Sequence, residues 1–325
     1  MKIGIHELHQ KVIATLSAGF SQEEASLTAD YLVWAEMAGV KTQGLVKLTG
    51  ATAFQHKKPQ HEIKVERDTK LSQLIDGGDH LSPYVSQVAV KAVVAKAKGH
   101  GIGIVGVHNA QSSNGAQAFY AAQIADKDLI GISLARTPAS AAAFGGIDAV
   151  FGTDPIGFSF PTKNEPLTFD MATTAMTVFG LIIANAKGEP IPENMAIDKD
   201  GNPTTDPGAA LDGALLSFDR SYKGSGMGMV VEILGGPLVG AAYGQVAGEW
   251  GNLFIAIDPE LFVDIEQFKA NVSDLMIKLM AARKAQGIKE IRLPGERAKA
   301  AHKEANRQGA VEVDESVLKQ LGYVE

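Results

Sequence analysis

The residues best suited to hold a polar ligand lie between Thr168 and Gly236. The first group follows a short hydrophobic run and consists of Asp170, Met171, Ala172, Thr173 and Thr174. We expect a strand to end here and a helix to begin, and the free N–H groups at a helix start bind anions such as a pyrophosphate. The carboxylate and the hydroxyls would then hold ribose or amide groups. Capping of the helix by Asp170 is the simpler alternative.

A lysine embedded in glycines forms the second group, at Tyr222, Lys223 and Gly224. The ammonium can pair with a phosphate or a carboxylate, and glycine lets a ligand approach the backbone closely. The alternative is a surface loop with a solvated lysine. Together the two groups predict a site that holds a polar ligand.

Histidines, glycines and serines offer weaker candidates. His108 ends a predicted strand and is the histidine best suited to proton transfer, because imidazole titrates near neutral pH; capping or packing is the alternative. No histidine pair has metal-ligand spacing with a third ligand nearby, so we expect no metal site. Gly101, Gly103 and Gly106 match a dinucleotide-binding pattern, but they lie inside a predicted strand, where glycine indicates close backbone packing.

The composition excludes several classes of protein. The 325 residues carry a net charge of −7 without an extended basic run, which argues against a nucleic-acid partner. No segment approaches ~20 apolar residues without a charge, so we expect no membrane partner. The absence of cysteine excludes disulfides, thiolate metal sites and a cysteine nucleophile. These features predict a soluble cytoplasmic protein.

Alternating helices and strands must position these groups. Helices are predicted over 5–18, 22–38, 83–97, 115–127, 171–186 and 260–285, with another beginning near Leu45. Strands are predicted within 61–76 and over 101–107, 129–135, 156–160, 167–170 and 253–257. Ser21 and Glu24 form a capping box at the start of the second helix. No repeat or linker interrupts the pattern, so we expect an α/β (mixed α+β) fold with interleaved domains.

Eight motifs follow one another along the chain. They are GVKTQGLVKL at 39–48, GIGIVGV at 101–107, LIGISLART at 129–137, FGTDPIGFSFP at 151–161, DMATT at 170–174, IPENMAIDKDGNPTTDP at 191–207, YKGSGMGM at 222–229 and IRLPGE at 291–296. In this order they resemble the malate/L-lactate dehydrogenase family of NAD(P)-dependent oxidoreductases. That family also includes diketogulonate reductases, ureidoglycolate and sulfolactate dehydrogenases, and cyclic-imine reductases.

The resemblance implies a non-Rossmann mixed sheet flanked by helices, a homodimer, and NAD or NADP as cofactor. Residues 1–115 together with 285–325 would form a substrate and dimerisation domain, and residues 116–284 a cofactor-binding domain. Cofactor contacts would come from residues 170–174, from Tyr222, Lys223 and Gly224, and from Pro294, Gly295 and Glu296. Thr42 and Lys47 would bind the substrate, with Lys47 pairing with its carboxylate.

Two positions depart from the family pattern. The family turn reads Asp-Ser-His-Gly, and here residues 41–44 read Lys-Thr-Gln-Gly, so Gln43 stands in place of a histidine assigned to proton transfer. A second family histidine falls at Ser113, or at Ser112 if the alignment slips by one residue. Glutamine can donate a hydrogen bond but does not titrate near neutral pH. The residue that transfers the proton is therefore open.

Three functions are consistent with this pattern. The protein could transfer a hydride between nicotinamide and a small 2-oxo or 2-hydroxy acid, taking its proton from His108, Lys41 or water. It could reduce a cyclic imine (ketimine), which arrives protonated and so already activated. It could also be a cofactor-binding homologue that has lost the dehydrogenase chemistry. Intact cofactor motifs favour the first two.

Overall fold

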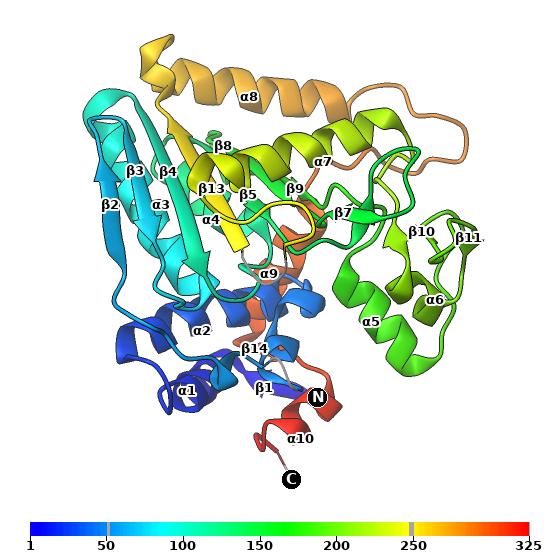
Figure 1. Ribbon diagram of the computed structural model, residues 1–325. Coiled ribbons are helices and arrows are strands. Elements are labelled where there is room, and N and C mark those ends of the chain that lie inside the picture. The colour runs from blue at the N-terminus through cyan, green and yellow to red at the C-terminus, as the bar shows by residue number, and fades with distance from the viewer. Residues whose placement is uncertain (51–52, 247–249, 325) are drawn as a thin grey trace.

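A seven-stranded sheet forms the centre of the computed structural model, which describes residues 1–50, 53–246 and 250–324 (Figure 1). Its strand order is β2-β3-β4-β13-β5-β8-β9. The strands are β2 (Lys64–Asp68), β3 (Ser72–Asp76), β4 (Ile102–Ala110), β5 (Ile130–Arg136), β8 (Ile156–Phe160), β9 (Leu167–Met171) and β13 (Trp250–Ile257). Only β3 and β4 run parallel among these neighbours. The expected mixed α/β fold is confirmed.

Helices cover both faces of this sheet. On one face lie α3 (Ser82–His100) and α4 (Gln117–Ala125), and on the other lies α7 (Tyr222–Gly235). Strand glycines set the spacing: a Cβ on Gly103 would stand 2.4 Å from the Val93 carbonyl oxygen of α3, and one on Gly131 would stand 2.5 Å from that of Ala121 in α4. The glycines of β4 therefore serve close packing, as their position inside a strand predicts.

The two ends of the chain pack together beneath the sheet (Figure 1). Strand β1 (Lys2–Gly4) pairs with β14 (Ala310–Glu312), and one hydrophobic cluster joins α1 (Ile5–Leu16) and α2 (Gln22–Met37) to α9 (Glu296–Gln308) and α10 (Glu315–Gln320). The N- and C-terminal segments thus share a core, while the central sheet takes strands from both sides of residue 115.

A smaller five-stranded sheet stands beside the central one, with the order β11-β10-β12-β6-β7. Its short strands are β6 (Ala141–Ala142), β7 (Ala149–Phe151), β10 (Ala196–Ile197), β11 (Pro203–Thr204) and β12 (Ala214–Leu215), and they pack against α5 (Val178–Lys187) and α6 (Pro207–Asp212). Helix α8 (Ile265–Met280) lies at the top of Figure 1, away from the two chain ends, and buries none of its side chains fully.

Most predicted elements occur with ends moved by at most three residues, but two expectations are wrong. The helix expected over 171–186 begins only at Val178, where the Thr177 hydroxyl accepts a hydrogen bond from Gly180 N–H at 3.1 Å. Helix α8 is shorter than 260–285, and Asp264 caps its start. The helix expected near Leu45 begins there and is a 3-10 helix.

The side chain of Glu24 also lies elsewhere than a capping box would place it. Ser21 caps α2 as expected, accepting from Glu24 N–H at 3.2 Å. The buried Glu24 carboxylate instead bonds His80 Nδ1 at 2.7 Å and Leu81 N–H at 2.9 Å. In the described part of the chain, no helix is both long and apolar enough to cross a membrane.

Candidate active site

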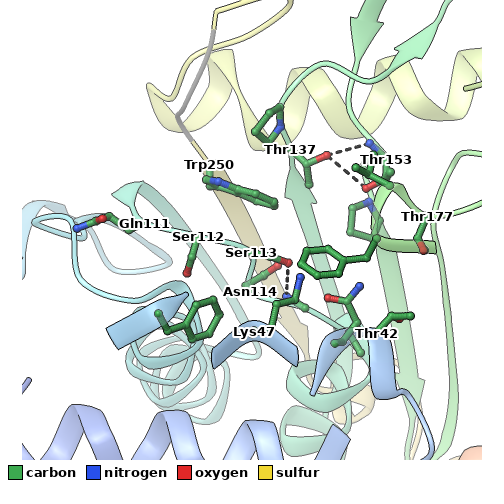
Figure 2. Close-up of a pocket in the computed structure, with 18 of the residues that line it drawn as sticks. Thr42, Lys47, Gln111, Ser112, Ser113, Asn114, Thr137, Thr153, Thr177 and Trp250 are labelled. Carbon is green, nitrogen blue, oxygen red and sulfur yellow. Dashed lines mark hydrogen bonds between the residues drawn. The ribbon is translucent and has the colours of Figure 1, made fainter. Parts of the chain in front are cut away.

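A cavity of about 870 Å³ opens where the N-terminal segment, the end of β9 and the start of α5 meet (Figure 2). Its walls hold Thr42, Gln43 and Lys47, the 111–116 loop, residues 137–140, and Asp170, Met171 and Ala172. In Figure 2 Lys47 rises from below toward Ser113, with Trp250 and Thr137 on the far wall. Segments that are far apart in the sequence therefore meet around one space.

Two short 3-10 helices, Lys41–Gln43 and Leu45–Leu48, present the lower wall. They are held by Glu36 of α2, which is 4% exposed and accepts a hydrogen bond from Leu45 N–H at 2.8 Å. Gly44 joins the two helices because any larger residue would collide: its Cβ would lie 2.2 Å from Glu36 Oε1. Glu36 thereby fixes where Gln43 and Lys47 stand.

The Lys47 side chain is buried, with an exposed fraction of 5%. Its ammonium nitrogen lies 3.5 Å from the centre of the Phe179 ring, which stabilises the cation. No carboxylate of the described residues comes within ion-pairing distance of it. Burial removes the ammonium from water without supplying a counter-ion. This disfavours the charged form and lowers the pKa of Lys47 to about 7.

The 111–116 loop is fastened from beneath by buried side chains. The Tyr31 hydroxyl accepts from Ala116 N–H at 2.9 Å, and Asn114 Nδ2 donates to Asn252 Oδ1 at 2.7 Å. Gly115 takes φ +82°, and its Cβ would stand 1.6 Å from the Tyr31 hydroxyl, so only glycine fits there. These contacts hold Ser112 and Ser113 at the rim of the cavity.

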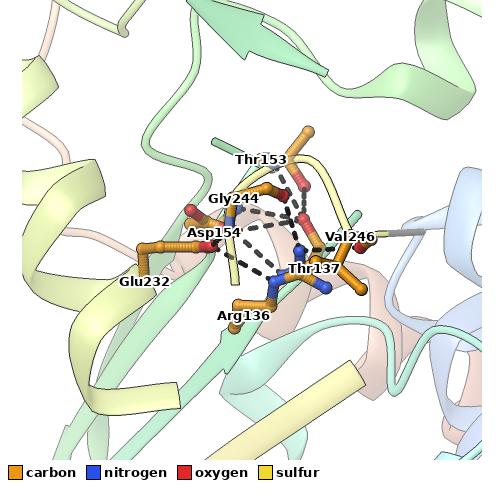
Figure 3. A network of polar contacts seen from close by, with 7 residues as sticks. All are labelled: Arg136, Thr137, Thr153, Asp154, Glu232, Gly244 and Val246. Carbon is orange, nitrogen blue, oxygen red and sulfur yellow. Dashed lines mark hydrogen bonds and ion pairs between the residues drawn. The ribbon is translucent and has the colours of Figure 1, made fainter. Parts of the chain in front are cut away.

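A buried charge network supports the far wall (Figure 3). Arg136 of β5 donates to Glu232 of α7 at 3.3 Å and to the carbonyl oxygens of Gly244 and Val246. Asp154 accepts from Thr137 N–H at 3.0 Å. Burial, reinforced by the charge of Glu232, raises the pKa of Asp154 well above its ordinary value, which favours its neutral form.

Asp170 lies at the end of β9 and lines the cavity. It caps α4 rather than the helix that was expected to follow it in the sequence. Its Oδ2 accepts from Ala118 N–H at 3.1 Å, so the carboxylate occupies the start of α4. Burial raises its pKa, and the N–H groups of Ala118 and Gln117 oppose that shift. The anion site expected at a helix start after residue 170 is wrong, because no helix begins there.

A second cavity of about 590 Å³ adjoins the first, and Val40, Ala116 and Asp170 line both. Pro294 and Gly295 form part of its wall. Its basic lining residues are Arg292, Lys299 and Lys303, and its acids are Glu165, which pairs with Lys303 at 3.0 Å, and Asp170. Burial lowers the pKa of His302, which also lines it.

Several predicted site residues line neither cavity. Thr173 and Thr174 are buried and bonded to Thr153 O and Met176 O. Tyr222, Lys223 and Gly224 begin α7, where Ser221 and Asp219 already accept backbone N–H bonds. His108 bonds Glu66 at 2.9 Å on β4, and Glu296 begins α9. The roles assigned to these residues stay predictions.

Within the described ranges, three buried polar atoms without hydrogen-bond partners belong to residues that line the first cavity. Among the described residues, Gln43 Oε1, Ser112 Oγ and Ser140 Oγ are buried without a hydrogen bond, and all three residues line the first cavity. Buried polar atoms normally have partners, so a ligand with its own donors and acceptors would complete these groups. No cluster of three or more potential metal ligands occurs in the parts of the chain that the structure describes.

Some residues that build the site escaped sequence reasoning. Glu36, Tyr31 and Phe179 act across 9 to more than 80 positions of sequence. The one available signal was Glu36 itself, an acid inside an otherwise apolar helical segment.

Glu36 gives the protein a measurable pH dependence. Burial raises its pKa to about 7, against about 4.5 for an unperturbed group. The folded state therefore binds more protons between these values, and stability is lost as pH rises from about 4.5 through 7. Relative to Glu36→Gln, the wild type should lose at most ~3 kcal/mol of unfolding free energy between pH 5 and 8, measured by urea denaturation. Parallel pH dependences of the two proteins would contradict this.

The chain thus combines a mixed α/β fold with a cavity between one end of the central sheet and an N-terminal segment. Residues 3–322 match the family model for malate/L-lactate dehydrogenase. The chain belongs to this family and is a dehydrogenase or reductase of its type.

Three similar proteins illustrate the range of the family. A malate/(S)-sulfolactate dehydrogenase from Methanothermus fervidus is 35% identical, covering 99% of this chain and 96% of the relative. A delta(1)-pyrroline-2-carboxylate reductase from Ancylobacter novellus is 30% identical, covering 99% and 96%. The solved sulfolactate dehydrogenase from Methanocaldococcus jannaschii superposes with a TM-score of 0.87 at 30% identity, covering 99% and 95%.

Proposed function

We propose that the protein is an NAD(P)-dependent oxidoreductase that transfers a hydride between nicotinamide and a small 2-oxo or 2-hydroxy acid in the first cavity. One observation carries this proposal. A single cavity gathers a buried lysine, three unpartnered polar atoms and residues 170–172, which the family resemblance assigns to the cofactor. The sulfolactate and malate substrates in the name of one relative are acids of this class.

The two adjoining cavities are large enough for a dinucleotide. In this proposal the nicotinamide half occupies the first cavity and the adenosine half extends past Ala116 and Asp170 into the second. The basic residues Arg292, Lys299 and Lys303 then lie near phosphate groups. Comparing the affinities of the protein for NADH and NADPH decides whether the bound ribose carries a 2′-phosphate.

When bound, the cofactor supplies or accepts the hydride. The chain's own residues position the substrate: Gln43 and Ser113 supply hydrogen-bond donors and acceptors, and the buried walls restrict water. Thr42 lines the same space, and Lys47, Lys57 and Lys58 bring positive charge to a substrate carboxylate.

A cyclic imine is the second candidate substrate. It is favoured by the absence of a histidine from the cavity wall, since Gln43 cannot titrate near neutral pH, and by the relative that is named as a pyrroline-2-carboxylate reductase. A protonated imine needs no further proton at its nitrogen, so it suits such a wall.

The homodimer is also part of this proposal. Helices α7 and α8 each expose large apolar side chains. These include Met227, Met229, Val230, Ile233, Leu275 and Ile277. A second copy covering them would explain the exposed apolar area, and light scattering should then give twice the mass of one chain rather than one.

Binding of NADH and NADPH tests the proposal first. Titration should raise the fluorescence of at least one of them, and 2-oxo acids or cyclic imines should then lower the absorbance at 340 nm. Ala116→Leu fills the wall that both cavities share and should weaken cofactor binding by about 10- to 100-fold, because overpacking costs 1–3 kcal/mol. Ala300→Leu, on the exposed part of α9, is the matched control.

Absence of binding by both cofactors would refute the proposal. Binding of a cofactor without oxidation by any member of the substrate panel would instead favour a cofactor-binding homologue that has lost the dehydrogenase chemistry. Equal weakening by both leucine variants would contradict the placement of the cofactor between the cavities.

A further inference from the structure

We infer that Lys47 is the proton carrier of the reaction, the role left vacant where the family pattern has histidine. The inference rests on the proposed function and assigns to Lys47 more than the pairing with a carboxylate expected of it. It rests first on position: Lys47 lines the same cavity as Gln43, Ser113 and residues 170–172.

Other proton carriers suggested by the sequence lie elsewhere. The Lys41 ammonium donates to the Glu312 carbonyl oxygen at 2.9 Å, and Lys41 does not line the cavity. His108 bonds Glu66 on β4 and lines neither cavity. Of these three residues only Lys47 faces the space in which substrate would lie.

The surroundings of Lys47 suit proton transfer better than charge pairing. Lys47 is 5% exposed and its ammonium stands over the Phe179 ring, where it has no hydrogen bond or ion pair with a described residue. A permanent charge-pairing site would normally supply a more solvated cation or a hydrogen-bonded one. Burial brings the pKa of this lysine to about 7, so both of its protonation states are populated at neutral pH, as efficient acid–base catalysis requires.

Burial, rather than a neighbouring charge, sets the pKa of Lys47. The other titratable residues that face the cavity are Asp170 from β9, Asp79 from the loop after β3, and Lys57 and Lys58, which follow a third 3-10 helix at Phe54–His56. Glu36 of α2 lies behind the 3-10 helices and is bonded to Leu45. Lys57 and Lys58 are then left to pair with the substrate carboxylate.

In reduction, a bound NAD(P)H would supply the hydride to the carbonyl carbon. As the C=O π bond breaks, the oxygen would take a proton from the Lys47 ammonium. The ketone becomes an alcohol, the cofactor is oxidised, and Lys47 becomes a neutral amine. In oxidation the neutral amine of Lys47 accepts the hydroxyl proton.

Titration of the protein without cofactor gives a direct readout. In a ¹³C-lysine NMR spectrum, one signal that is missing from Lys47→Arg should titrate with a midpoint near 7. A midpoint above 9, close to that of ordinary lysine, would overturn the inference.

Kinetics separate a proton carrier from a charge anchor. Lys47→Arg keeps the positive charge but cannot release a proton in the accessible pH range. We expect kcat for keto-acid reduction to fall by ~10²–10⁴-fold, with cofactor binding retained and the pH dependence near 7 lost. Lys47→Met should lose the same pH dependence. Lys199→Arg, on an exposed turn, is the control and should match the wild type.

The outcomes distinguish this inference from the proposed function. An unchanged kcat and pH profile in Lys47→Arg, with NADH or NADPH still bound, would overturn the role of Lys47 alone. Failure of wild type to bind either cofactor would overturn the proposed function. Thermal unfolding of both variants checks that they fold, and if arginine does not fit, the methionine variant and the NMR midpoint decide the question.

Discussion

Replacing Glu232 with alanine should lower the free energy of unfolding by about 3–5 kcal/mol, because it removes a carboxylate that pairs with the buried guanidinium of Arg136. The same Glu232 oxygen accepts a hydrogen bond from Gly244 N–H at 2.6 Å, and that acceptor would be lost as well. Urea denaturation followed by circular dichroism measures the change.

The effect should reach the cavity. Arg136 is followed directly by Thr137, whose backbone N–H bonds Asp154 and whose side chain meets Thr153 on the far wall. We therefore expect cofactor binding to weaken in Glu232→Ala even where the protein remains folded. Glu232→Gln keeps an acceptor oxygen of the same shape and should lose less stability. An alanine variant as stable as the glutamine variant would show that the charge pair contributes little.

Replacing Gly115 with alanine should cost about 2–6 kcal/mol of stability. Part of this is the left-handed backbone, at φ +82°, which costs a residue with a Cβ about 1–3 kcal/mol. The rest is the collision with the buried Tyr31 hydroxyl, 1.6 Å from the new Cβ, since overpacking costs another 1–3 kcal/mol. The 111–116 loop would have to move, so cofactor affinity should fall together with stability.

Gly99→Ala is the matched control for that substitution. Gly99 lies in α3 with nothing within 4 Å of the added Cβ. Alanine favours the helix there by up to about 1 kcal/mol, so this variant should be as stable as wild type or slightly more so. If Gly115→Ala behaved like Gly99→Ala, the account of the loop would be wrong.

Local patterns predicted most of the fold. The periodicity of residues 22–38 and the cap at Ser21 gave α2 to within one residue, and the apolar run at 156–160 gave β8. The helix expected over 171–186 begins only at Val178 because the residues before it make other contacts. Met171 pairs with Ile156 in the central sheet, and Thr174 forms a bridge with Ser217.

The site was predictable in part, and the limit is physical. The ordered motifs predicted Gln43, Lys47, Ser113 and residues 170–172 as site residues, and all of these line one cavity. Sequence could not show that Lys47 lies on the Phe179 ring or that Glu36 holds the turn before it. These contacts join segments that only the folded chain brings together, and they set the pKa values on which the chemistry depends.

A crystal structure of the protein soaked with NADH, or NADPH if it binds more tightly, tests the central claim most directly. The account predicts a dinucleotide that passes Ala116 and Asp170, with nicotinamide C4 facing the space between Gln43, Lys47 and Ser113. A nicotinamide ring bound outside this cavity, or no bound dinucleotide at a saturating concentration, would contradict it.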